Sequence, residues 1–427
     1  MKVLVALSLL LGLSVVGTSP SGAATTPCSI FTVNYTGGSI SQIDGATNTV
    51  SQTLLVGGQY GIAVAPSGDL YVPNAGSTVW SIDALTDVAT PISVGNGANG
   101  AAVTGAGAVY VADTGLDAVL VIDGVVGSPT YNTVVTTIPV GSDPYFVGIA
   151  PGGGIYVPNL LDDTVSVIDG VPTSPTYNTV VATIPVGDGP QGVAVSPAGM
   201  VYVTNIGSVA EAGTTVSVID GVPGSPTYNT VVATITGFNS PFGVAVAASG
   251  AVYVTNIGAA SLSVIDPATN TITSTVSLTG IPYAIAAAPS GALYVTNLTG
   301  ASVWVIDGST NAVTTTVTVG TGPTAIAVRG CLPQPEPAVS VVVSGDGRTI
   351  DVNGSNFPSS SVVTISIDRV VVGTVTTGAD GAFSIMLGNV DCGVASGVLT
   401  ATSGAESAST PVTLTSCGPV AVPVFAG

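Results

Sequence analysis

The stretch that decides the fold is Val201-Tyr202-Val203-Thr204-Asn205, a short run rich in β-branched and aromatic residues. Such a run predicts a β-strand. Its aromatic residue returns along the chain at spacings of 39 to 51 residues. The seven positions are Phe31, Tyr71, Tyr110, Tyr156, Tyr202, Tyr253 and Tyr294. The chain is therefore built from seven repeats of one unit.

Each repeat contains four short strand-like segments. In the fifth repeat these segments are 192–196, 200–204, 215–220 and 231–236. An Ile-Asp pair closes the third segment of every repeat, and we expect these Asp side chains to hydrogen-bond their own turns. The seven Asp residues are Asp44, Asp83, Asp123, Asp169, Asp220, Asp266 and Asp307. Four short strands per 40 to 50 residues are typical of a propeller blade. The sequence thus predicts an all-β fold with a seven-bladed β-propeller over residues 28–331.

The two ends of the repeat region predict how the ring closes. The first repeat begins at Ile30 without a first strand, whereas a spare strand, 324–328, follows the seventh repeat. We expect the spare strand to complete the first sheet, because an open ring would leave an unpaired strand edge. Aligning the repeats puts Cys28 and Cys331 at consecutive positions of the missing turn. This register favours a Cys28–Cys331 disulfide.

The other two cysteines, Cys392 and Cys417, both lie in the C-terminal region, and we expect them to form the second disulfide. Four cysteines allow three pairings. Free buried thiols are the alternative to both bonds.

The repeats resemble the YVTN family of β-propellers, which are found in bacterial and archaeal surface-layer and secreted proteins. Residues 201–205, 252–256 and 293–297 carry the signature. The resemblance covers about 28–330. It implies a seven-bladed propeller, extracellular residence, and binding more readily than catalysis.

Other repeats depart from this signature. Pro73 and Pro158 replace the threonine, and we expect them to weaken the strand ladder locally, because proline cannot donate a backbone hydrogen bond. Asp113 replaces the asparagine. Related propellers include a streptogramin lyase that uses His and lactonases that use a Glu-Asn-Asp metal site. The chain has no His, and Glu211 is the only Glu of the propeller.

The composition excludes much chemistry. Of the 427 residues, 46% are hydrophobic and 6% are charged; 23 are acidic, none is His, and the bases are Lys2, Arg329, Arg348 and Arg369. Catalysis by Ser-His-Asp or Cys-His, His-ligated zinc and, once Lys2 is removed, a Schiff-base lysine are therefore excluded. Nucleic acid is not expected as a partner, because its binding depends on clustered Lys and Arg.

Segments outside the repeats predict export and a second domain. Lys2 precedes an apolar run, 3–16, and small residues at Ala23 and Ala24, so residues 1–24 have the pattern of a secretory signal peptide. The run is too short for a membrane span, and no later segment predicts one. A Pro-rich linker at 332–337 leads to residues 338–427, whose seven short β-runs predict an Ig-like β-sandwich.

Seven acidic residues fall in loops that we expect on one face of the propeller: Asp113, Asp117, Asp143, Asp162, Asp163, Asp188 and Glu211. Crowded carboxylates without basic partners repel one another, and a hard cation would relieve the repulsion. We therefore name Asp162, Asp163, Asp188 and Glu211 as candidate ligands of Ca²⁺, which is a possible cofactor and not a required one. Docking of a cationic partner is a second hypothesis. A charged surface that only keeps the protein soluble is the alternative to both.

On the opposite face, three long loops read Ser-Pro-Thr-Tyr-Asn-Thr. They carry Tyr131, Tyr177 and Tyr228, which are candidate binding residues because aromatic side chains on loops suit recognition. The alternative is that each Tyr packs under its own loop.

These observations favour a secreted or cell-surface, non-catalytic propeller that acts in binding or in the cell envelope. We name no catalytic residue. The expected partner is an extracellular protein, a glycan or a component of the cell envelope. A metal-dependent lactonase-like or lyase-like enzyme that works at the central channel is the alternative.

The first prediction concerns the disulfide. Proteolysis without reduction should yield a linked peptide pair containing Cys28 and Cys331, detected by mass spectrometry. Closing a loop of this length is worth roughly 5 kcal/mol in the chain-entropy picture, so Cys331→Ser should lower the free energy of unfolding by an amount of that order. Peptides in which Cys28 and Cys331 are unlinked would contradict the closure.

Overall fold

The computed structural model describes residues 28–56, 60–208, 211–330, 338–343, 349–355, 362–367, 370–378, 382–388, 396–403 and 406–413. Every regular element in this part of the chain is a β-strand. Contacts divide the chain into two compact units, of which one is Pro27–Cys331. The predicted signal peptide and linker lie outside the described residues.

The first unit contains seven four-stranded antiparallel sheets, numbered here in chain order. Sheet 1 is β28 (Pro323–Arg329), β1 (Ser29–Asn34), β2 (Ser39–Asp44) and β3 (Thr49–Leu55). Sheet 2 is β4 (Ala63–Val64), β5 (Leu70–Pro73), β6 (Thr78–Ile82) and β7 (Ala89–Ser93). Sheet 3 is β8 (Ala98–Val103), β9 (Ala108–Asp113), β10 (Ala118–Asp123) and β11 (Val134–Pro139). Sheet 4 is β12 (Gly148–Ile149), β13 (Gly154–Asn159), β14 (Thr164–Asp169) and β15 (Val180–Pro185).

The remaining three sheets follow the same order. Sheet 5 is β16 (Pro190–Val195), β17 (Met200–Gly207), β18 (Ala212–Asp220) and β19 (Val231–Thr236). Sheet 6 is β20 (Pro241–Val246), β21 (Val252–Asn256), β22 (Ser261–Asp266) and β23 (Thr271–Ser277). Sheet 7 is β24 (Pro282–Ala287), β25 (Ala292–Asn297), β26 (Ser302–Asp307) and β27 (Ala312–Thr318).

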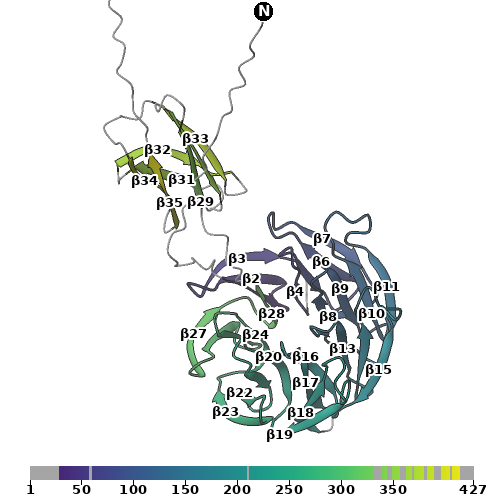
Figure 1. Ribbon diagram of the computed structural model, residues 1–427. Coiled ribbons are helices and arrows are strands. Elements are labelled where there is room, and N and C mark those ends of the chain that lie inside the picture. Colours follow the sequence, from purple (N-terminus) through teal and green to yellow (C-terminus); the bar gives the residue numbers. More distant parts are fainter. Residues whose placement is uncertain are drawn as a thin grey trace, which may run out of the picture. The chain divides into compact units, whose positions relative to one another are not determined.

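The sheets stand in a ring, with the first strand of each sheet toward the centre and the fourth at the rim (Figure 1). Each inner strand contacts the next one around the circle, and β24 contacts β28. The arrangement is that of a β-propeller. The ring closes as predicted, because β28 pairs with β1 in the antiparallel sense and Ser29 is the register partner of Arg329.

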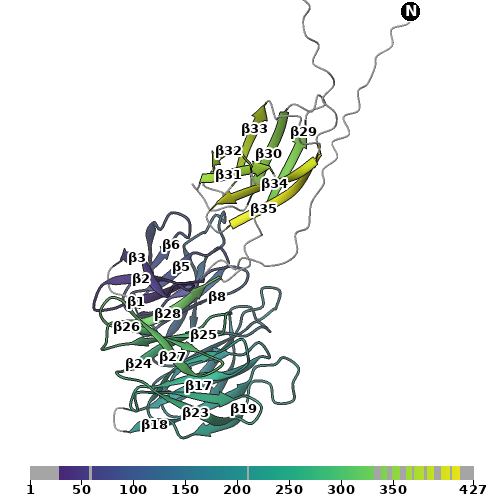
Figure 2. The same ribbon diagram turned by 90° about the vertical axis from the view of Figure 1, so that its left-hand side faces the viewer.

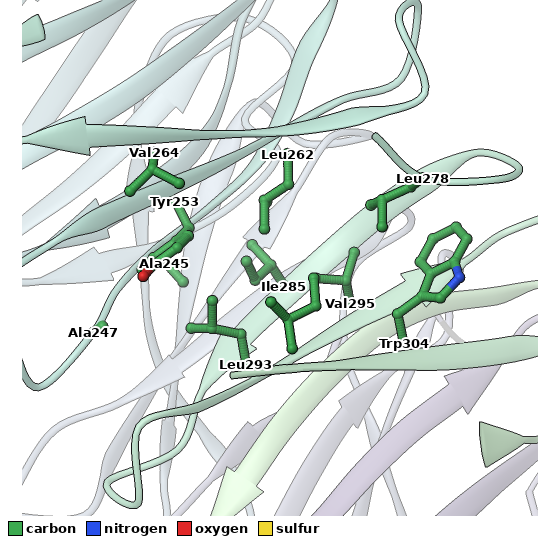
Figure 3. Packing of buried hydrophobic residues seen from close by; sticks show 11 residues of the cluster. Ala245, Ala247, Tyr253, Leu262, Val264, Leu278, Ile285, Leu293, Val295 and Trp304 are labelled. Atoms are coloured by element: carbon green, nitrogen blue, oxygen red, sulfur yellow. The ribbon is translucent and has the colours of Figure 1, made fainter. Parts of the chain in front are cut away.

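Apolar side chains fill the space between neighbouring sheets. Figure 3 shows one such cluster, in which Leu262 and Val264 of sheet 6 meet Ile285, Leu293 and Val295 of sheet 7. All five are buried. Their burial between two sheets explains why the second and third strands read as nearly continuous apolar runs.

Five of the motif tyrosines join their sheet to the next one. The hydroxyl of Tyr110 in sheet 3 donates to Oδ1 of Asn178 in sheet 4, at 2.6 Å, and Tyr156 donates to Asn229 of sheet 5 at 2.8 Å. Tyr294 of sheet 7 donates to Asn48 of sheet 1 at 3.1 Å, so the series passes across the closure. The accepting asparagines have φ between 53° and 59° in these turns. Asn tolerates this left-handed conformation better than most residues, which explains its place here.

The motif threonines join inner strands. The Oγ1 atom of Thr204 accepts the backbone N–H of Gly192 at 2.9 Å and donates to the carbonyl of Phe242 in sheet 6 at 2.7 Å. A Cβ atom on Gly192 would lie 2.1 Å from that carbonyl oxygen, so the position requires glycine. Where proline replaces this threonine, in sheets 2 and 4, the inner strands β4 and β12 are only two residues long. The predicted local weakening of the ladder is confirmed.

The interface between sheets 1 and 2 lacks the tyrosine bond. Phe31 has no hydroxyl, and Asp87, with φ of 55°, stands where the other turns have asparagine. Instead, Nε2 of Gln52 donates to Oδ2 of Asp87 at 3.0 Å. The guanidinium carbon of Arg329 lies 4.6 Å from the centroid of the Phe31 ring, a cation–π contact. At this interface, therefore, both the donating tyrosine and the accepting asparagine of the hydrogen bond between sheets are replaced.

The Ile-Asp turns behave as predicted. Oδ1 of Asp44 accepts the backbone N–H groups of Ala46 and Thr47, at 2.8 and 3.0 Å. In the exposed turn of sheet 2, hydrogen bonds from the hydroxyl and amide of Thr86 and the amide of Leu85 hold the pKa of Asp83 below its usual range. These acids belong to the turns and are not part of a site.

The described residues of the second unit form seven strands in two sheets, which Figure 2 labels. One sheet is β29 (Ala338–Val343), β30 (Thr349–Ser355) and β33 (Phe383–Gly388). The other is β32 (Val370–Thr376), β31 (Val362–Ile367), β34 (Ser396–Ser403) and β35 (Glu406–Thr413). Side chains from both sheets share one buried apolar cluster, which includes Val352, Ile365 and Leu399.

The second prediction concerns the tyrosine bond between sheets. Tyr110→Phe removes the donor to Asn178 and should lower the free energy of unfolding by about 1 kcal/mol in chemical denaturation. The chain offers a matched control in Tyr202 of sheet 5. The asparagine that corresponds to Asn178 in the next sheet is Asn270, in the turn between β22 and β23 of sheet 6, and its Oδ1 has no hydrogen-bond partner. Tyr202→Phe should therefore be nearly neutral. Equal losses in both variants would contradict the assigned role.

Candidate functional site

The centre of the ring encloses an apolar cavity of about 150 Å³. Inner strands of all seven sheets contribute to its wall, through residues such as Ile62, Ala101, Val193 and Ile326. None of the described residues that line it is acidic or basic. The cavity offers van der Waals contact to an apolar group and no side chain that could transfer a proton near neutral pH.

Aromatic side chains meet across one end of this channel. The ring centroids of Tyr60 in the sheet 2 segment and Tyr145 in the sheet 4 segment are 6.2 Å apart, and those of Phe146 and Phe242 are 6.1 Å apart. Each pair comes from sheets that are not neighbours, so the contacts must span the channel. Phe242 also packs on Tyr283 at 3.8 Å between centroids. We call Tyr60, Tyr145, Phe146, Phe242 and Tyr283 the aromatic layer.

Burial holds Tyr145 and Tyr283 of this layer in the neutral form. It raises the pKa of Tyr145 far above the usual value, with further contributions from the Tyr283 and Tyr60 hydroxyls that lie beside it. Burial raises the pKa of Tyr283 in the same way. Tyr145 and Tyr283 therefore offer ring faces and neutral hydroxyls, and neither is a phenolate base.

The aromatic layer was not predicted from the sequence, although a signal for it exists. In five repeats a proline opens the inner segment, at Pro144, Pro190, Pro241, Pro282 and Pro323. The residue after each proline occupies the same position in its repeat, and Tyr60 and Asn99 occupy this position in the two repeats that lack the proline. The seven residues at this position are Tyr60, Asn99, Tyr145, Gln191, Phe242, Tyr283 and Thr324. Large aromatic residues at a position that faces the axis predict a closed channel.

Three of the seven predicted acidic residues accept hydrogen bonds from backbone amides of neighbouring links. Oδ1 of Asp117 accepts the N–H of Asp143 at 2.9 Å, and burial followed by the charge of Asp117 raises the pKa of Asp143. Oδ2 of Asp162 accepts the N–H of Ser142 at 2.7 Å, and Oδ1 of Asp163 accepts that of Gly189 at 2.9 Å. These bonds give three of the acids a structural role that the sequence did not reveal.

The four candidate Ca²⁺ ligands do not share one kind of environment. Asp162 and Asp163 are engaged by the link amides, whereas Asp188 and Glu211 line a cavity of about 450 Å³ beside sheet 5. In the described ranges, no three His, Cys, Asp or Glu side chains come together in a group that could hold a metal ion. The single four-acid centre is therefore not preformed, and binding of Ca²⁺ stays a prediction.

Asp113 is the one predicted acid that is fully buried. It occupies the motif asparagine position, and its Oδ1 accepts the N–H groups of Gly115 and Leu116 at 3.1 Å each. In sheets 1, 4, 5 and 6 the motif asparagine donates to two hydroxyls of the third strand, but sheet 3 has Ala118 and Leu120 there. Its Oδ2 has no hydrogen-bond partner, and burial raises the pKa of the carboxyl.

The predicted binding tyrosines are half-buried against the preceding sheet and do not pack only under their own loops. The hydroxyl of Tyr131 donates to Oδ2 of Asp69 in the sheet 2 segment, at 3.3 Å. Tyr177 and Tyr228 lie close enough to the motif tyrosines Tyr110 and Tyr156 to raise their pKa values, after the larger effect of burial. Their roles in recognition stay predictions.

No known family model matches the sequence, and no curated protein matches it either. Solved structures do match. Hydrazine synthase of Kuenenia stuttgartiensis is 21% identical over 69% of this chain and 92% of its own, with a TM-score of 0.53. A Lactobacillus plantarum protein is 14% identical over 71% and 99%, with a TM-score of 0.60, and a streptogramin B lyase is 14% identical over 78% and 96%, with a TM-score of 0.51. These likenesses establish the β-propeller fold and nothing about activity.

In the part of the chain that the structure describes, no helix is long and apolar enough to cross a membrane.

The third prediction concerns Asp113. Because its pKa in the folded protein lies above the unfolded value of about 3.9, the charged carboxylate costs stability above that pH, and the cost vanishes below it. The stability of Asp113→Asn relative to the unchanged chain should therefore be more favourable at pH 7 than near pH 3, because only the carboxyl titrates in this range, whereas the cost of an Asn amide without a hydroxyl acceptor is the same at both pH values. Denaturation at pH 7 and near pH 3 measures this; a difference between the two chains that does not depend on pH would contradict it.

Proposed function

We propose that the protein is a secreted or cell-surface propeller that binds a partner and does not catalyse a reaction. The observation that carries the proposal is the central channel, which is apolar, crossed by contacts within the aromatic layer, and free of acidic and basic side chains among its described lining residues. An enzyme working at the channel would need a general acid, a general base or a metal there. The lyase similarity adds only the fold.

The proposal includes an assignment of both units to known architectures. We take the seven sheets as seven blades of a YVTN-type propeller, and the two sheets of the second unit as an Ig-like sandwich. The tyrosine and threonine bonds between sheets support the first, and the shared apolar cluster of the second unit supports the other.

The Cys28–Cys331 bond is also proposed. Cys28 is 8% exposed and is not a free thiol, whereas Cys331, Cys392 and Cys417 lie outside the described residues. Since Ser29 and Arg329 are register partners, Cys28 and Cys331 flank the paired ends of β1 and β28. A covalent link there would hold the closure shut.

Export to the cell surface is supported by the N-terminal pattern of Lys2, the apolar run and the small residues. The partner is proposed to be an extracellular protein, a glycan or a cell-envelope component. A pull-down from culture supernatant and cell wall, with the full exported chain as bait, would identify it.

The fourth prediction separates binding from catalysis. The purified protein should show no turnover of lactones or glycosides in the presence of Ca²⁺ or Mg²⁺, because the channel supplies no proton-transfer group. Turnover that Asp162→Asn abolishes would overturn the proposal in favour of a metal-dependent lactonase-like or lyase-like enzyme. The control is the same assay with chelator in place of the metal.

A further inference from the structure

Sheet 5 departs from the other propeller sheets in its central hairpin. Its second and third strands, β17 and β18, are eight and nine residues long, whereas the corresponding strands of the other six sheets have four to six. The additional pairing reaches Gly207 and Ala212. Gly207 has φ of 93°, a conformation that favours glycine. The longer hairpin forms one wall of the 450 Å³ cavity.

The cavity has an acceptor-rich lining. Asp188 comes from the link before β16, Glu211 stands at the start of the extended β18, and Thr215 and Ser217 follow on the same strand. No lining residue is basic, and Arg329, the only base in residues 28–331, lies in sheet 1. The two carboxylates therefore have no cationic partner within this pocket.

Asn205 supplies a second, independent sign of a ligand. It lines the cavity and is 1% exposed, and its Oδ1 has no hydrogen-bond partner. In sheets 6 and 7 the same atom of Asn256 and Asn297 accepts a link amide, at 3.4 and 3.3 Å. A buried amide oxygen without a donor is costly, so a donor from a ligand would stabilise it.

The hydroxyls beside Asn205 complete the pattern. Its Nδ2 donates to Oγ1 of Thr215 at 2.8 Å and to Oγ of Ser217 at 3.0 Å. Because both hydroxyl oxygens already accept, their hydrogens are free to donate to a ligand. Asn34 and Asn159 also have an unpartnered Oδ1, but their hairpins are of ordinary length.

We propose that this pocket binds a small organic molecule that carries a primary ammonium group and neighbouring hydroxyl groups. The carboxylates of Asp188 and Glu211 pair with the ammonium, Oδ1 of Asn205 accepts a hydrogen bond from the ligand, and the hydroxyls of Thr215 and Ser217 donate to it. A cavity of 450 Å³ falls within the range of small-molecule sites. A bare Ca²⁺ ion needs six to eight oxygens at close range, which two carboxylates around so large a space do not supply.

The experiment is calorimetric titration of the full exported chain with glucosamine, at a pH below the pKa of its amine. N-acetylglucosamine is the matched probe, since it keeps the hydroxyls and the ring but has no positive charge. We expect glucosamine to bind and N-acetylglucosamine to bind at least tenfold more weakly, because charge-assisted hydrogen bonds are the stronger ones.

Variants test the residues. Glu211→Gln and Asp188→Asn should each weaken glucosamine binding about tenfold or more, and both residues are exposed, so the fold should survive. Asp266→Asn is the control: it removes one charge from a turn of sheet 6, where Asn can accept the same backbone N–H.

Two results would overturn the proposal. One is the absence of heat with glucosamine, or equal heats with the two probes. The other is Ca²⁺ binding that Glu211→Gln abolishes and that excludes glucosamine, which would make the pocket a metal site. Neither result bears on the non-catalytic role, because this pocket shares no lining residue with the channel cavity.

Discussion

The hydrogen bond from a motif tyrosine to an asparagine of the next sheet is the recurring interaction of this propeller, and it joins five of the seven pairs of neighbouring sheets. Its two partners always belong to different sheets, so no repeat can satisfy its own buried hydroxyl. A buried polar group without a partner costs free energy, and each sheet therefore requires its neighbour. Because Tyr294 of the last sheet donates to Asn48 of the first sheet, the series of bonds continues across the point where the ring closes. The same bond that joins other successive sheets thus also supports the closure that the pairing of β28 with β1 makes.

Departures from the repeat show how strict this requirement is. Where tyrosine becomes Phe31, the accepting asparagine becomes Asp87, and Gln52 and Arg329 take over the contacts. Where the motif asparagine becomes Asp113, the hydroxyls that it would have bound are absent from the third strand. A change on one side of a buried contact is matched by a change on the other side. The sequence thus preserves the pairing and not the individual residue types.

Periodicity predicted the strands and the closing strand, because these depend on patterns that recur within each repeat. It predicted the turn role of Asp44 and its equivalents for the same reason. It did not predict that Tyr110 bonds Asn178, or that Asp163 accepts the amide of Gly189, because these pairs form between repeats and depend on the ring geometry. The aromatic layer was missed because its contacts cross the axis between sheets that are far apart in the chain.

A repeat protein also reveals where pairing is left incomplete. At the sheet 1 and sheet 2 interface, the altered residues have found new partners within the chain. The polar residues around the extended hairpin of sheet 5 lack such partners. Asp188 and Glu211 line a cavity that contains no basic residue, and the amide oxygen of Asn205, which lines the same cavity, has no hydrogen-bond donor. Incomplete pairing costs stability without any return in the isolated chain. A bound ligand would supply the missing hydrogen-bond and charge partners and so remove this cost. The ligand proposal therefore rests on the sheet 5 pocket and not on the interface of sheets 1 and 2, where the altered residues already have partners within the chain.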